Sequence, residues 1–244
     1  MRILVVNPNT TGSMTARIGS AARAVAAPGT EIAAVNPAMG PASIEGYYDE
    51  AFAVPGLLEE IARGEAQGVD GHVIACFDDT GLEAARSIAR APVVGIGEAA
   101  FHMASLIAGR FTVVTTLDRS VPAIEHNLMK YGLDRRCARV RAAEVPVLAL
   151  EDAASDARRR VDETIAEAKL EDRAEAIVLG CAGMADLAAT LSAAHGLPVV
   201  DGVACAVKLV EGLAVLGLRT SKTLGYQPPR PKPYSGLLDR FAPQ

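Results

Sequence analysis

The sequence predicts an α/β fold built as two similar lobes, each a roughly four-stranded, mainly parallel sheet flanked by helices. Short runs rich in Val and Ile alternate with longer Ala-rich stretches that have apolar residues three and four positions apart. The short runs are apolar at consecutive positions, which is typical of strands in a parallel sheet covered on both faces. Similar segments also recur about 105 residues apart, which indicates an internal duplication.

Eight segments have the composition of buried strands. In chain order they are residues 2–7, 31–35, 72–75, 92–96, 111–115, 140–144, 176–179 and 198–200. The helical pattern between them includes residues 49–67, 98–108, 157–168 and 185–195. This alternation predicts βαβ units with right-handed crossovers. Residues 227–234 contain four prolines and predict an extended arm on the surface.

The duplication is clearest in residues 72–76 (HVIAC) and 177–181 (IVLGC), where a buried strand ends in a cysteine. A turn and a helix follow each, and then a strand that opens with Pro-Val-Val. The cysteines are 105 residues apart and the prolines 106, while strand 111–116 resembles strand 2–7 at an offset of 109. Three matches in the same order predict two lobes related by a pseudo-twofold axis, with the functional site between them.

Composition excludes several classes of protein. The 244 residues are 50% hydrophobic and 22% charged, so the chain is not disordered and can bury a core without disulfides. A net charge of −5 without a basic patch argues against binding to nucleic acid. The sequence has no uncharged apolar run of 18 residues and no signal peptide. We therefore expect a cytoplasmic globular protein that does not enter a membrane.

Two of the four cysteines occupy positions typical of a functional site. None forms a CxxC pair, so we expect free thiols and no metal. Ligands of open α/β sheets bind beyond the carboxyl ends of the strands, where Cys76 and Cys181 lie in equivalent repeat positions. Each precedes an expected helix N-terminus, which lowers the pKa of a thiol. Across a pseudo-twofold cleft the two thiols face each other.

Two opposed thiols suit inversion at an acidic carbon, without a cofactor. A thiolate on one face of a planar carbanion removes a proton, and a thiol on the other face returns one. Backbone N–H groups of the adjoining turns stabilise the enolate charge. Free cysteines are more often small core residues, and we expect that role for Cys205, with Cys137 at the surface or at a hinge.

At these residues the sequence resembles the aspartate/glutamate racemase superfamily, and within it the branch of hydantoin and allantoin racemases. The resemblance covers essentially the whole chain and rests on residues 7–11 (NPNTT), 75–82 (ACFDDTGL) and 179–184 (LGCAGM). Amino-acid racemases typically have Thr-Glu after the second cysteine, where this chain has Ala182-Gly183. That difference leaves no carboxylate there for the ammonium group of an amino acid.

The resemblance implies cofactor-independent, two-base racemisation at C5 of a 5-substituted hydantoin, a small-molecule substrate. Cys76 and Cys181 match the two catalytic cysteines. One asparagine matches a substrate contact, the turns after the cysteines match turns whose N–H groups hold the ring carbonyl oxygens, and two threonines close the pocket. These expected substrate-binding residues are Asn9, Phe77, Asp78, Thr115, Thr116, Ala182 and Gly183.

The resemblance also implies a homo-oligomer and a discontinuous first lobe. We place residues 1–97 and 205–244 in the first lobe, which carries Cys76, and residues 98–204 in the second, which carries Cys181. The chain would then return to the first lobe near Cys205.

Several alternatives stay open. An allantoin racemase of purine catabolism would use the same cysteines, whereas a decarboxylase of the superfamily needs only one. A cis–trans isomerase would use a cysteine as nucleophile and would bind two carboxylates. A small-molecule binding protein would only pack the thiols in its cleft. Asp78 and Asp79 either orient a ring N–H or cap a helix, and Gly95-Ile96-Gly97 is interpreted as a turn between the lobes.

Overall fold

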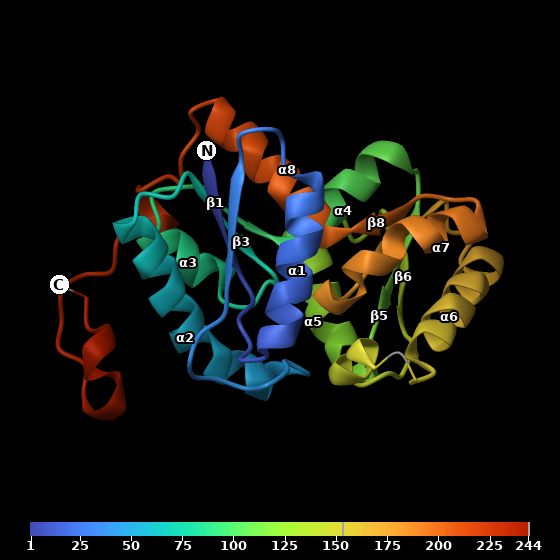
Figure 1. Cartoon of the computed structure of the whole chain (residues 1–244), viewed down its shortest axis with the longest axis horizontal. Helices are drawn as coiled ribbons and strands as arrows, with labels where there is room; N and C mark the ends of the chain where they lie inside the picture. The colour runs from blue at the N-terminus through green and yellow to red at the C-terminus, as the bar shows by residue number, and fades with distance from the viewer. Residues whose placement is uncertain (153, 244) are drawn as a thin grey trace.

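Two four-stranded parallel sheets form the framework of the computed structural model, which describes residues 1–152 and 154–243. The strands are β1 (Arg2–Val6), β2 (Glu31–Val35), β3 (Gly71–Ile74), β4 (Val93–Gly95), β5 (Phe111–Thr115), β6 (Cys137–Ala142), β7 (Ala176–Leu179) and β8 (Val199–Asp201). The strand orders are β2-β1-β3-β4 and β6-β5-β7-β8, and they are the same if β5 to β8 are the repeats of β1 to β4. The predicted fold class, two similar α/β lobes, is confirmed (Figure 1).

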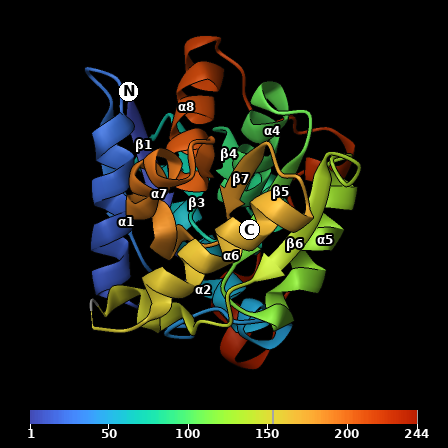
Figure 2. The ribbon, with the colours of Figure 1, turned by 90° about the vertical axis from the view of Figure 1, so that its right-hand side faces the viewer.

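Helices cover both faces of each sheet. They are α1 (Gly12–Val25), α2 (Tyr47–Ala66), α3 (Leu82–Ile88), α4 (Ile96–Ile107), α5 (Val121–Lys130), α6 (Ala157–Glu171), α7 (Ala188–His195) and α8 (Gly202–Val215). Helices α2 and α3 lie on the outer side of the first sheet, and α6 and α7 on the outer side of the second (Figures 1 and 2). Helices α1, α4, α5 and α8 contribute to the core between the sheets.

The strands are apolar throughout because their two faces contact different cores. In β1, Ile3 and Val5 belong to the central core, whereas Leu4 and Val6 pack against α2 and α3. Successive side chains of a strand point to opposite faces, so a strand covered on both sides needs an apolar residue at every position. This is the pattern from which the sequence predicted parallel sheets.

One central core joins the two lobes. It contains Val73 of the first sheet, Val113 of the second and, between them, Phe101 of α4. The Phe101 ring meets Phe77 edge-to-face at a centroid distance of 5.3 Å and stacks on Phe111 at 6.1 Å. Both arrangements are favourable for aromatic rings. The lobes are therefore held together by buried side chains rather than by a surface contact.

The last helix, α8, contacts α1, β3 and β4, and also α4 and β8. Beyond it, the Thr220 N–H donates to the Arg90 carbonyl oxygen at 3.1 Å, next to β4. Residues 227–234 are exposed and form neither helix nor strand. The boundaries of the lobes at 97/98 and 204/205 stay a prediction.

The sequence did not locate the start of β6, which lies at the edge of its sheet. This strand begins at Cys137, three residues before the expected segment 140–144. Its polar side chains, which include Arg139 and Arg141, do not fit the continuous apolar pattern of a strand covered on both faces. The expectation of a hinge at Cys137 is wrong, because this half-buried residue is part of the sheet.

The expected helix 185–195 is also shorter than predicted. Residues Ala182–Leu187 form a 3-10 helix, η3, and α7 follows from Ala188. None of the described helices combines the length and hydropathy needed to cross a bilayer.

The central core should contribute strongly to the free energy of unfolding. Phe101 is completely buried, so Phe101→Ala removes a ring that touches both lobes and should lower the free energy of unfolding by about 3–5 kcal/mol. Leu170, which is 83% exposed on α6, is the control, and Leu170→Ala should cost less than about 0.5 kcal/mol. Urea unfolding followed by circular dichroism measures both. Equal losses in the two variants would contradict the shared core.

Candidate active site

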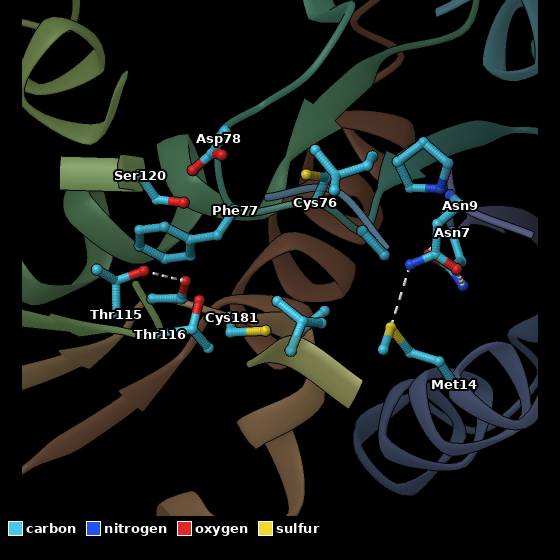
Figure 3. A pocket seen from close by; sticks show the side chains of 16 residues that line it. Asn7, Asn9, Met14, Cys76, Phe77, Asp78, Thr115, Thr116, Ser120 and Cys181 are labelled. Atoms are coloured by element: carbon cyan, nitrogen blue, oxygen red, sulfur yellow. Dashed lines mark hydrogen bonds between the residues drawn. The ribbon is translucent and has the colours of Figure 1, made fainter. Parts of the chain in front are cut away.

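A small cavity lies at the carboxyl ends of the strands, between the lobes. Its volume is about 40 Å³, and most of the lining comes from the loops after β1, β3, β5 and β7 (Figure 3). Besides both cysteines, the lining includes six of the seven expected substrate-binding residues, namely Asn9, Phe77, Asp78, Thr115, Thr116 and Ala182. Gly183 lies just beyond it. Equivalent loops of the two repeats thus build a single site.

The two thiols approach this cavity from different lobes. Cys76 follows β3 and Cys181 follows β7, and the two side chains lie on opposite sides of the pocket (Figure 3). The Cys76 Sγ is 3.4 Å from the Thr80 Oγ1. The arrangement is the one expected from the repeat, because each cysteine ends the third strand of its lobe.

Backbone N–H groups face both sulfur atoms. The Asp78 N–H donates to Cys76 and the Gly183 N–H donates to Cys181, so each thiol meets the amide two residues further along its turn. Such a hydrogen bond favours the thiolate and lowers the pKa of the thiol. Gly183, expected to contact the substrate, thus lies against the sulfur of Cys181.

The expectation that a helix N-terminus lowers the pKa of these thiols is wrong. Helix α3 begins only at Leu82, and Cys181 is followed by η3 rather than by an α-helix. Burial raises the pKa of the Cys76 thiol well above its ordinary value, and the nearby Asp78 carboxylate raises it further. Burial likewise raises the pKa of Cys181, to about 11. Both groups therefore rest as thiols at neutral pH.

Carboxyl groups surround the site. Burial and the neighbouring Glu50 and Asp79 raise the pKa of Asp78 to about 7. Burial also raises the pKa of Glu50, whose Oε1 is buried with no hydrogen-bond partner in the described part of the chain. The lining, as far as the structure describes it, includes no Lys, Arg or His. An anionic ligand would therefore find no compensating cation among the described lining residues.

Two asparagines after β1 form a rigid corner of the cavity. The Asn7 Nδ2 donates to the Asn9 Oδ1 at 2.8 Å and to the Thr15 Oγ1 at 3.0 Å. The Asn9 Oδ1 also accepts from the Thr11 N–H at 2.9 Å, and its Nδ2 lies 3.2 Å from the Met14 Sδ (Figure 3). Asn7 thus fixes the side chain of Asn9.

The threonines after β5 lie in the second lobe. The Thr115 Oγ1 donates to the Gly180 carbonyl oxygen at 3.1 Å. A Cβ at residue 180 would lie only 2.8 Å from the Thr115 Cβ, so glycine is required for this approach. The contact holds the end of β5 against the strand that leads to Cys181.

Sequence reasoning missed several lining residues. They are Asn7, Pro8, Met14, Ile44, Ala75, Ser120, Val147 and Gly180. Asn7, Pro8, Ala75 and Gly180 lie inside the three quoted motifs, so their position beside the expected contacts was a usable signal. Ile44, Ser120 and Val147 come from loops without a recognisable pattern.

The two neighbouring aspartates have different roles. Asp78 lines the cavity, whereas Asp79 accepts hydrogen bonds from the backbone N–H groups of Gly97 at 3.0 Å and Glu98 at 2.8 Å. Asp79 therefore caps a helix, but the helix is α4 rather than the one that follows it in sequence. Residues 95–97 lead directly from β4 into α4, without the separate turn that was expected.

Comparisons with known proteins agree with this site. A family model described as Asp/Glu/Hydantoin racemase matches residues 3–210. The chain belongs to this family. It is 53% identical to a hydantoin racemase of Rhizobium meliloti, over 97% of this chain and 98% of the relative. It is 46% identical to a hydantoin racemase of Pseudomonas sp. (strain NS671), over 99% and 97% of the two chains.

A solved structure gives a second line of comparison. The allantoin racemase from Klebsiella pneumoniae superimposes with a TM-score of 0.97 at 52% identity, with 100% of each chain covered. The expected family is thus confirmed, and with it the racemase class of isomerase.

The raised thiol pKa values predict how the cysteines react with iodoacetamide. Because only the thiolate reacts, alkylation of Cys181 should be slow at pH 7 and should accelerate about tenfold per pH unit up to pH 9. Cys76, whose pKa is also raised, should show the same slope. Peptide mass spectrometry at each pH measures both sites, with circular dichroism as the check that the fold persists. A rate that levels off below pH 8 would show lowered pKa values instead.

Proposed function

We propose that the protein is a cofactor-independent racemase that inverts C5 of 5-substituted hydantoins with Cys76 and Cys181 as its two acid/base groups. The observation that carries the proposal is the placement of two thiols, one from each lobe, on opposite sides of one small cavity. Inversion at a carbon requires proton removal from one face and delivery to the other. The family to which the chain belongs supports the same reaction.

The proton balance is simple. One cysteine, as thiolate, takes the C5 proton, and the electron pair of the C–H bond passes into the ring enolate. The other cysteine, as thiol, delivers its proton to the opposite face of C5. The two sulfurs have then exchanged protonation states, and proton exchange with solvent resets them. A high thiol pKa makes the thiolate scarce and also a stronger base, which suits a weakly acidic C–H group.

Two backbone amides remain to stabilise the enolate. The N–H groups of Asp78 and Gly183 face the sulfurs, which leaves those of Phe77 and Ala182 beside the cavity without a protein acceptor in the described chain. We assign them to the ring carbonyl oxygens, where charge develops as the proton leaves. Asn9, held by Asn7, and the Thr115–Thr116 pair complete the binding surface.

The charge of the site favours a neutral substrate. The described lining has no Lys, Arg or His to hold a carboxylate, which argues against the diacid isomerase and the decarboxylase that the sequence left open. A hydantoin is neutral, and its N–H groups are donors that a carboxyl oxygen accepts. The two families of relatives, named for hydantoin and for allantoin, act on the same ring, because allantoin is hydantoin with a ureido group at C5.

Allantoin is the second candidate substrate, and the polarity of the cavity favours it. Asp78 and Ser120, which line the cavity, offer acceptors to the ureido N–H groups. A benzyl substituent has no such donors.

The test follows single enantiomers of allantoin, 5-methylhydantoin and 5-benzylhydantoin in D₂O, by optical rotation and by deuterium incorporation at C5. We expect racemisation with deuterium in the product, fastest for allantoin. The absence of both signals with all three compounds would refute the proposed function. Deuterium exchange without loss of rotation would refute the two-base mechanism.

Replacing either proposed catalytic cysteine should impair racemisation. Cys76→Ser and Cys181→Ser should each lower kcat/KM for racemisation by about 10²- to 10⁴-fold, since a serine hydroxyl is a much weaker acid than a thiol. Each variant should still exchange the C5 proton of the one enantiomer that faces its remaining cysteine. Cys137→Ser and Cys205→Ser, whose thiols lie outside the cavity, are the matched controls and should keep full activity. Full activity of either cavity variant would contradict the assignment.

We also propose that the protein is a homo-oligomer and that residues 227–243 contact a second copy. This arm leaves the body of the first lobe (Figure 1) and exposes Leu237 to 94%. Beside it, α2 exposes Tyr48 and Phe52, and the groove between them measures about 890 Å³. The arm has three basic residues and one acidic residue, so its charge is +2 and the remaining chain carries −7. An acidic second copy is therefore the complementary partner for it.

Removal of the arm tests this proposal. The full chain should elute as an oligomer in size-exclusion chromatography with light scattering, and a chain ending at Tyr226 should be monomeric or much weaker in association. Leu237→Ser with Leu238→Ser should act in the same direction without shortening the chain. A monomeric full-length protein, or an oligomer unchanged by either alteration, would contradict it.

A further inference from the structure

The side chain of Asp79 joins the turn of Cys76 to the start of α4. Asp79 is 6% exposed, and its N–H donates to the Cys76 carbonyl oxygen at 3.1 Å. Its Oδ1 accepts from the Gly97 N–H and its Oδ2 from the Glu98 N–H, the second and third residues of α4. The N–H groups of the first turn of a helix have no acceptor within the helix, and the side chain of the residue just before the helix normally accepts their hydrogen bonds.

The second repeat caps the equivalent helix in the usual way. The Asp201 carboxylate accepts from the N–H groups of Val203 at 3.1 Å and Ala204 at 2.8 Å, so α8 is capped by its own preceding residue. The position in the first repeat that corresponds to Asp201 is Gly95. A Cβ at residue 95 would lie 2.0 Å from the Asp79 Oδ1. The first repeat has thus exchanged a local cap for one that comes from the Cys76 turn, and Gly95 leaves room for it.

The second lobe contacts the same turn. The Tyr131 hydroxyl, at the end of α5, donates to the Asp79 Oδ2 at 2.7 Å. One turn earlier on α5, the Asn127 Nδ2 donates to the Asp78 carbonyl oxygen at 2.8 Å. Both oxygens of the Asp79 carboxylate are therefore occupied, and this carboxylate lies outside the cavity lining.

From this geometry we infer that Asp79 is a positioning residue, which holds Cys76 in register with Cys181 by tying the Cys76 turn to α4 and to α5 of the opposite lobe. The inference rests on the proposed two-base function. The backbone at Asp79 is left-handed, with φ of 51°, so the turn needs an added constraint to keep this form. The three side-chain hydrogen bonds supply it.

Asp79→Asn is the direct test, because asparagine tolerates a left-handed backbone and has almost the same shape. Its amide group places an N–H donor where the aspartate accepts, so at least one of the hydrogen bonds is lost. Asp201→Asn makes the same change at the local cap of α8 and is the matched control. A displacement of Cys76 by a fraction of an ångström or more should lower kcat for racemisation by about 10- to 100-fold, with little change in KM.

The ratio of deuterium exchange to inversion separates positioning from mere stability. In Asp79→Asn, Cys181 still removes a proton from one enantiomer, but the displaced Cys76 fails to protonate the opposite face. That enantiomer should gain deuterium without inverting, several-fold more often than in the wild type. Asp201→Asn should keep the wild-type ratio whatever its loss of stability. Equal ratios in Asp79→Asn and the wild type would overturn the inference.

A second variant covers the case in which Asp79→Asn folds poorly. Asp79→Gly removes the remote cap at a backbone position that glycine tolerates, and Gly95→Asp in the same chain restores a local cap of the Asp201 kind. The double variant should recover the melting temperature lost in Asp79→Gly and should remain slow in racemisation, with an elevated exchange ratio. Recovery of activity together with stability would show that Asp79 only caps α4, and would overturn the inference.

The two proposals fail in distinguishable ways. If the function is wrong, the wild type neither exchanges nor inverts any hydantoin. If only the inference is wrong, the wild type racemises and Asp79→Asn behaves like Asp201→Asn. Tyr131→Phe removes the hydrogen bond that Tyr131 donates to the Asp79 carboxylate and leaves the Asn127 bond to the Asp78 carbonyl oxygen in place. It should raise the exchange ratio in the same direction as Asp79→Asn, to a smaller extent.

Discussion

The inner faces of both sheets bury against one layer of helices, and the position of the site depends on this shared core. Val73 and Val113, from different sheets, belong to the same cluster as Phe101 of α4. Because protein interiors are close-packed, a shift of one sheet relative to the other would open voids around these side chains. The ends of β3 and β7 are therefore fixed relative to each other, and with them the two sulfurs. A reaction that uses both faces of one carbon depends on this fixed separation.

The electrostatics of the cavity add a second constraint. Burial favours the neutral thiol at both cysteines, and the carboxyls of Asp78 and Glu50 favour it further at Cys76. One backbone N–H at each sulfur opposes this and stabilises the thiolate. The balance keeps a proton on the sulfur at rest and gives a strong base once it is lost. The lining, as far as the structure describes it, has no basic side chain, which favours a neutral ring over an anion.

Much of this arrangement could be predicted from the sequence. Strands buried on both faces are apolar at every position, so seven of the eight expected segments overlap closely with those in the structure, and the repeat placed Cys76 and Cys181 in equivalent loops. Contacts between distant segments could not be predicted in this way. The cap that Asp79 supplies to α4 links residues 18 and 19 positions apart, and Ser120 and Val147 reach the cavity from loops without a periodic pattern. The thiol pKa values were predicted in the wrong direction because burial and nearby carboxylates depend on the assembled fold.

The packing of α8 against β3 and β4 also affects the order of assembly during synthesis. Strands β1, β3 and β4 leave the ribosome early, but their inner face is completed by Val203, Val207 and Val210, which are made more than a hundred residues later. Until then, Val5, Val73 and Val94 lack part of their cover, and the nascent first lobe exposes an apolar sheet. Contacts so distant in sequence slow folding and lengthen the interval in which chains can aggregate. A chain that stops before α8 would carry Cys76 and Cys181 and still lack the packing that covers the inner face of its first sheet.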